Sequence, residues 1–127
     1  MSDNDSVPPL AQTLWAMSDQ VAKLQAGLSL ALSEDGLSVE QFRAMEAITR
    51  LESPVMGELV KDTGFANASL SRIIDGLEDQ ALAYRVPDPT DKRRITVQLS
   101  ALGESLFRRA CGRAAQWAKA SEASFTN

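Results

Sequence analysis

A run of three cations, Lys92, Arg93 and Arg94, follows Asp91 in the segment DPTDKRRITVQLS. Lysine and arginine bind phosphate and carboxylate groups, and arginine can donate two parallel hydrogen bonds to either. The Asp91 carboxylate can hold a neighbouring arginine through a charge-assisted hydrogen bond. The other cations would then face solvent or phosphate, so the run is a candidate phosphate-binding site.

A second polar group, Ser69, Ser71 and Arg72, lies on a helix expected to begin near Asn67 or Ala68. Its apolar positions follow the i, i+3, i+4, i+7 pattern of one buried face. They are Leu70, Ile73, Ile74 and Leu77. Small residues permit close approach, hydroxyl groups can bond to phosphate or bases, and arginine can pair with guanine. Taken alone, either polar group also fits an ordinary solvated surface.

Two helices joined by a short turn would position this second group. A helix over about 56–63 is followed by Gly64 as a stop signal, and the next helix runs over about 67–80. This arrangement is a helix-turn-helix, whose second helix enters the DNA major groove. Before it, Ser38 and Gln41 are spaced for a capping box that begins an earlier helix.

The cation run lies beside the turn of an expected β-hairpin. Residues 82–86 and 94–99 read as strands, and 87–92 read as the turn. Ile95, Val97 and Leu99 point to one face, where they would anchor the second strand. A hairpin directly after a helix-turn-helix is a wing, and this context favours a binding role for the cations.

Two long helices flank these elements. The first, over about 10–32, has apolar residues at alternating spacings of four and three. They are Leu10, Leu14, Met17, Val21, Leu24 and Leu28. The last helix runs from a Ser100 cap to about Ser124, with Ala110, Ala114 and Ala118 along one edge. The first can pack in the core or on a second subunit, and the second subunit is favoured because the residues downstream can close their own core. The last helix can pack against the first helix or on a second subunit.

Composition narrows the chemistry. The 127 residues correspond to one domain, include no His, and include a single Cys. A His/Cys zinc site or a Ser-His nucleophile therefore cannot be built within one chain. No Gly-rich phosphate loop is present, so neither an enzyme nor a bound cofactor or metal is expected. No membrane span or export signal is seen, which predicts a cytoplasmic protein without membrane contact.

Residues 37 to about 107 resemble the MarR family of bacterial winged-helix regulators. LSVEQFRAMEAI resembles the family's second helix, and ELVKDTGFANASLSRIIDGLEDQALAYR looks like its helix-turn-helix and first wing strand. DPTDKRRITVQLSALGESL resembles its wing and the start of the next helix, and is the most specific segment. The expected fold is mainly α with a small β-hairpin. A disordered lead-in over 1–9 precedes a single domain, 10–127, with a winged helix-turn-helix over about 37–100 and dimerisation helices over about 10–33 and 100–125.

The resemblance implies a homodimer that binds a pseudo-palindromic operator in double-stranded DNA, usually as a repressor released by a small aromatic ligand. By position, it places Asn67, Ser69, Ser71 and Arg72 on the DNA-contacting helix, and Asp91 and Arg93 at the wing tip. Lys92 and Arg94 complete the expected DNA-contacting set beside them. A ligand pocket between the dimer helices and the winged unit would draw on Trp15, Phe42 and Met45, which also read as plain core residues.

A rival interpretation is a winged-helix protein–protein interaction module with weak or no DNA binding. The net charge is −4, and cations and acids between Asn67 and Leu99 balance to zero. The chain also departs from the family pattern. Ala81 stands where the family usually has Gly, the first helix lacks the Cys of the oxidation-sensing branch, and the last helix is shorter than the family norm.

Overall fold

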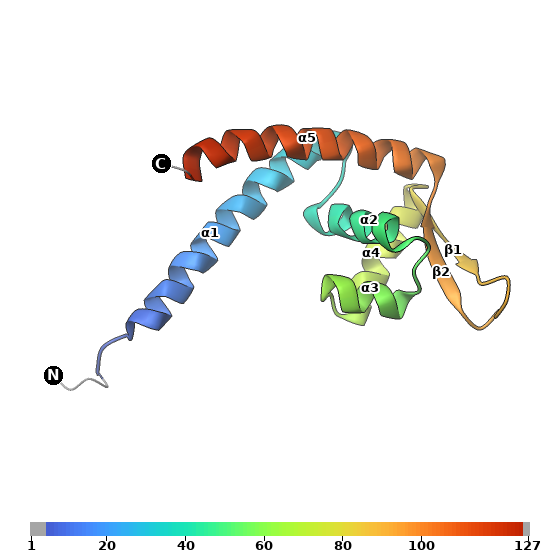
Figure 1. The fold of residues 1–127 in the computed structure, drawn as a ribbon, viewed down its shortest axis with the longest axis horizontal. Coiled ribbons are helices and arrows are strands. Elements are labelled where there is room, and N and C mark those ends of the chain that lie inside the picture. Colours follow the sequence, from blue (N-terminus) through green and yellow to red (C-terminus); the bar gives the residue numbers. More distant parts are fainter. Residues whose placement is uncertain (1–4, 126–127) are drawn as a thin grey trace.

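The computed structural model describes residues 5–125 and places the winged elements beneath one end of a long helix (Figure 1). In chain order the elements are α1 (Pro9–Leu32), the 3-10 helix η2 (Ser33–Asp35), α2 (Val39–Leu51), α3 (Met56–Thr63), α4 (Asn67–Asp79), β1 (Ala83–Pro87), β2 (Ile95–Leu99) and α5 (Ala101–Phe125). The expected fold, mainly helical with one small hairpin, is confirmed. The lead-in expected over 1–9 falls partly on residues 1–4, which lie outside the described residues, and Pro9 already belongs to α1.

Local sequence signals account for the beginnings of α2 and α5. Ser38 Oγ accepts a hydrogen bond from the Gln41 backbone N–H at 3.0 Å, and the Gln41 side chain accepts one from the Ser38 N–H at 3.1 Å. This is the expected capping box. Ser100 Oγ accepts the Gly103 N–H at 2.9 Å and donates to the Ala81 carbonyl at 2.7 Å. The cap of α5 therefore also fixes α5 to the turn that follows α4.

Helix α4 ends in a left-handed residue that is not glycine. Ala81 has φ +61°. Its N–H donates to the Glu78 carbonyl at 2.9 Å, and the Leu82 N–H donates to the Leu77 carbonyl at 2.8 Å. These two bonds form a Schellman motif, which normally carries glycine at the left-handed position because glycine has no Cβ. The motif therefore forms at some conformational cost, and it sets the direction of β1.

The hairpin pairs β1 with β2 in antiparallel register from Ala83↔Leu99 to Pro87↔Ile95. Each strand begins one residue later than expected. Val97 is fully buried and Leu99 nearly so, but Ile95 is 45% exposed, so its expected role as an anchor is wrong. It lies at the end of the paired region, beyond the helices that cover the other two. A bridge between Val55 and Thr96, and the Val97 N–H bonded to the Pro54 carbonyl at 2.8 Å, join β2 to the start of α3.

One hydrophobic core lies between α2, α3, α4 and the hairpin, and α5 covers it. Its largest fully buried side chains include Leu32, Met45, Leu59, Leu70, Ile74, Leu77 and Val97. The C-terminal part of α1 packs against α5, where Gly27 lies against the Trp117 ring. The N-terminal half of α1 projects away from every other element (Figure 1). The winged unit thus closes its own core, whereas the N-terminal half of α1 packs against no other element within residues 5–125.

Candidate nucleic-acid interface

The predicted contact residues of α4 lie in its first two turns. Asn67 and Arg72 are exposed, and Ser69 and Ser71 are half-buried beside them. Ala66 precedes the helix and offers no side-chain cap, so the first N–H groups of α4 have no side-chain acceptor. Among the described residues, the Arg72 side chain forms no hydrogen bond or ion pair. This end of α4 therefore presents hydroxyl groups, an amide and an unpaired cation.

A shallow groove separates α4 from the beginning of α2. It has a volume of about 430 Å³ and is lined by Ser38, Glu40, Gln41, Ser69, Arg72 and Ile73. Glu40 and Arg72 both line this groove, so one acid accompanies the unpaired cation there.

The acids in the second half of α4 are engaged by the first wing strand. Arg85 on β1 lies 3.0 Å from Asp75 and also binds Glu78. Both carboxylates are therefore partly neutralised within the chain, which reduces their repulsion of an approaching anion. Arg85 in turn is not an unpaired cation. The sequence showed these residues but gave no signal of their pairing, which depends on how β1 folds back along α4.

The tip of the wing is held by two aspartates. The Asp88 carboxylate accepts hydrogen bonds from the Thr90 N–H at 2.9 Å and the Thr90 hydroxyl at 2.7 Å. These bonds hold the pKa of Asp88 below its usual value. Asp91 Oδ1 accepts the Arg93 N–H at 3.1 Å and lies 3.6 Å from Arg93 Nε. The expected contact between Asp91 and an arginine is therefore present, although the Arg93 side chain remains 94% exposed.

The three wing cations have different surroundings. Lys92 is exposed and forms no ion pair among the described residues, and Arg93 is exposed apart from its loose contact with Asp91. Arg94 instead lies 3.4 Å from Glu58 on α3 and 3.8 Å from Asp88. Sequence reasoning treated the three as one group, but the fold separates Arg94 from the other two.

The candidate ligand residues lie in different surroundings. Met45 is fully buried, Phe42 is half-buried with its ring 5.5 Å from that of Phe107, and Trp15 is 57% exposed on α1. None of the three lines the furrow beside α1 or the hollows between α2 and α4, between α2 and β2, and between α3 and the wing. Within one chain, Phe42 and Met45 are therefore core residues.

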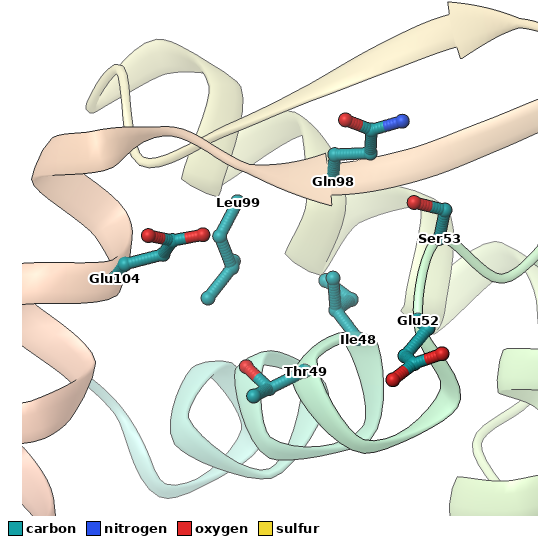
Figure 2. Close-up of a pocket in the computed structure, with 7 residues that line it drawn as sticks. All are labelled: Ile48, Thr49, Glu52, Ser53, Gln98, Leu99 and Glu104. Carbon is teal, nitrogen blue, oxygen red and sulfur yellow. The ribbon is translucent and has the colours of Figure 1, made fainter.

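A different hollow lies between the end of α2, β2 and the start of α5 (Figure 2). Its volume is about 240 Å³, and it is lined by Ile48, Thr49, Glu52, Ser53, Gln98, Leu99 and Glu104. Glu104 reaches it from α5, and Glu52 lies at the other end (Figure 2). Two carboxylates make this lining unfavourable for an anionic ligand.

Two further findings concern residues 5–125 only. No helix in that range is long and apolar enough to cross a membrane. The same residues contain no cluster of three or more His, Cys, Asp or Glu side chains arranged to hold a metal ion.

Comparisons with known proteins agree with this geometry. A family model described as MarR family matches residues 35–94. Apo wild-type MarR from E. coli superimposes with a TM-score of 0.73 and 26% identity over 87% of this chain and 79% of that chain. A mutant MarR from E. coli complexed with operator DNA gives a TM-score of 0.76 and 25% identity over 91% of this chain and 81% of that chain.

A third similar structure is an organohalide-sensing transcriptional regulator, RdhR, in its 2,4-dichlorophenol-bound form. It has a TM-score of 0.82 and 21% identity over 98% of this chain and 74% of that chain. A search of curated protein sequences found no match. The family model spans α2 to the wing turn, and so covers every candidate DNA-contacting residue.

Proposed function

Because the chain belongs to the MarR family of winged-helix, DNA-binding transcription regulators, we propose that it is a homodimeric repressor of a pseudo-palindromic operator. In this proposal it works in the cytoplasm and leaves the DNA when a small aromatic ligand binds. The observation that carries the proposal is the distribution of cations. Arg72 on α4 and Lys92 in the wing form no ion pair among the described residues, and Arg93 is almost fully exposed.

The first two turns of α4 would enter the major groove. Asn67, Ser69 and Ser71 can bond to bases or phosphates, and Arg72 can donate two hydrogen bonds to guanine. Lys92 and Arg93 at the wing would bind phosphate or enter the minor groove. Arg94 belongs to the expected set but differs from them, because two carboxylates already contact it.

The exposed face of α1 supports dimerisation. Leu10, Leu14, Met17 and Val21 are between 53% and 80% exposed, although they form one apolar stripe. An apolar furrow runs beside Leu10, Leu14 and Met17. A symmetric interface uses the same stripe on both subunits and would place two recognition helices on one duplex.

The ligand part of the proposal rests on the resemblance and on the dimer. A structurally similar regulator was solved with 2,4-dichlorophenol. Trp15 lies on the exposed half of α1, so a second subunit could complete a pocket that also reaches Phe42 and Met45.

Arg93→Ala tests DNA binding directly. Fluorescence anisotropy would follow labelled fragments of the DNA upstream of the protein's own gene, at two salt concentrations. Each lost phosphate contact should weaken binding about eightfold at 0.1 M salt and flatten the salt slope by about 0.9. Arg109→Ala is the matched control, because Arg109 is an exposed arginine on α5 whose side chain has no ion-pair partner within residues 5–125.

Equal binding by Arg93→Ala and the parent would show that the wing assignment is wrong. If the parent shows no salt-dependent binding at micromolar concentration, the rival, a protein–protein interaction module, is favoured.

A further inference from the structure

The contact between Arg94 and Glu58 joins the wing to the first turn of α3. Arg94 Nη2 lies 3.4 Å from Glu58 Oε1, and Arg94 Nε lies 3.8 Å from Asp88 Oδ2. Glu58 Oε1 also accepts the Val55 N–H at 3.1 Å, which satisfies an N–H group at the beginning of α3. One carboxylate oxygen therefore has two separate tasks, a helix cap and an ion pair.

Backbone hydrogen bonds hold the wing base beside α3 independently of that ion pair. The Val97 N–H donates to the Pro54 carbonyl at 2.8 Å, and Val55 pairs with Thr96 in a β-bridge. Because these links do not involve the side chains of Glu58 or Arg94, the wing should keep its place when the ion pair is removed.

Arg94 lines a concave surface that would face DNA phosphate under the proposed function. This surface, of about 460 Å³, separates the start of α3 from the wing, and it is lined by Val55, Met56, Gly57, Asp91, Arg93, Arg94 and Ile95. Arg94 is 54% exposed and Glu58 is 48% exposed, so water screens their attraction. Glu58 contacts Arg94 from α3 and is not among the residues that line this surface, so its effect on an approaching phosphate is that it occupies Arg94.

We propose that Glu58 is a negative determinant of DNA affinity, which withholds Arg94 from the phosphate backbone. This inference rests on the proposed DNA-binding function and adds to it a residue that limits the strength of binding. The protein would then bind DNA with fewer cations than its wing sequence contains. Such a limit suits a regulator that must also leave its operator.

Glu58→Gln separates the two tasks of the side chain. The amide oxygen can still accept the Val55 N–H, so the cap of α3 is kept, while the negative charge is lost. Binding should become about eightfold tighter per subunit at 0.1 M salt, and the salt slope steeper by about 0.9 per subunit, as expected for one added phosphate contact. Anisotropy titrations on the same upstream DNA fragments would measure both quantities.

Two further variants identify the cause of any gain. Within an Arg94→Gln background, Glu58→Gln should give no gain over Arg94→Gln alone, because the released cation is absent. Glu104→Gln makes the same charge change on α5, where Glu104 has no ion-pair partner among the described residues, and should alter affinity less than about twofold. Circular dichroism melting checks that each variant folds.

The inference is overturned if Glu58→Gln binds no more tightly than the parent, or if its gain survives the loss of Arg94. It is also overturned if Glu104→Gln gives an equal gain, since net charge alone would then explain the effect. These results require a parent that binds DNA. A parent without salt-dependent binding would instead refute the proposed function, and the inference with it.

Discussion

The winged unit buries its apolar residues, whereas the N-terminal half of α1 exposes them. Between α2 and β2, side chains such as Met45, Leu70 and Ile74 are fully buried, and every buried side-chain polar atom described in the structure has a partner. On α1, by contrast, Leu10 is 80% exposed and Leu14 is 63% exposed. A single chain therefore completes its DNA-reading unit but not the scaffold that would place two such units on one duplex.

The difference follows from where each element can find a packing surface. The helices of the winged unit cross one another and share one core. Helix α1 meets α5 near its C-terminal end, where Gly27 lies against Trp117, and its N-terminal half extends away from the other elements (Figure 1). A contiguous exposed apolar stripe of this kind commonly marks a protein–protein interface. The comparison thus predicts that the two regions respond differently to mutation.

The largest effect should come from charging the α1 stripe. The double change Leu14→Glu and Met17→Glu places carboxylates in the proposed interface, and each position occurs twice in a symmetric dimer. Full burial of each side chain contributes about 1.5–3 kcal/mol, so the dimer should lose at least about 6 kcal/mol. Sedimentation equilibrium would then show a monomer whose DNA affinity has fallen.

The matched control is Gln12→Glu, on the opposite side of the same helix, which should leave the dimer intact. Far-UV circular dichroism should stay helical in all variants, because Leu14 and Met17 contribute little to the core of the single chain. A charged stripe that still sedimented as a dimer would contradict the proposed interface.

Short-range signals predicted most of the fold. The capping box at Ser38, the stop at Gly64 and the cap at Ser100 depend on residues within a few positions of one another, and the structure contains all three. The predicted start of each strand is one residue early, whereas the end of the second strand at Leu99 is confirmed. The prediction for Ile95 is wrong because alternation gives the face on which a side chain lies but not how far along the strand that face is covered.

Local sequence signals did not predict which charged residues of the candidate site pair with one another. Arg85 pairs with acids on α4, and Arg94 pairs with Glu58 from 36 positions earlier. Charge type alone marks both arginines as possible anion ligands. Only the packing of the wing against α3 and α4 shows which cations already have partners, and no local sequence pattern encodes that information.

The contact between α5 and the winged unit should respond next most strongly. At Gly103, in the first turn of α5, an added Cβ would lie 2.0 Å from the Leu82 carbonyl oxygen, which belongs to the backbone and cannot easily move. Gly103→Ala should therefore destabilise the fold by about 1–3 kcal/mol, as overpacking does. Urea denaturation would measure the change in the free energy of unfolding.

Gly112 provides a control on the same helix, because no atom lies within 4 Å of the Cβ that alanine would add there. Gly112→Ala should stabilise the protein by about 0.5–1 kcal/mol, since alanine loses less backbone entropy in a helix. If both substitutions had the same sign, close approach at Gly103 would not explain its effect. The presence of glycine at position 103 would then need another explanation.

The smallest change in stability should come from inside the winged unit, where the core is well packed but one alanine has a left-handed backbone conformation. Ala81 is exposed and has φ +61°, a conformation that costs an L-residue roughly 1–2 kcal/mol and costs glycine little. Glycine also gains entropy in the unfolded chain, which offsets part of the benefit. Ala81→Gly should therefore raise the free energy of unfolding by roughly 1 kcal/mol, measured by urea denaturation.

Ala120→Gly, at an exposed position within α5, tests the predicted sign of the change in the free energy of unfolding. The same change of residue there should destabilise the protein by about 0.5–1 kcal/mol, because φ is helical and glycine brings only its entropic cost. Opposite signs at the two positions would show that backbone conformation, rather than the lost methyl group, decides the outcome. A loss of stability at Ala81 would mean that its methyl group makes contacts that outweigh the left-handed strain, and that the winged unit is better optimised than its dihedral angles indicate.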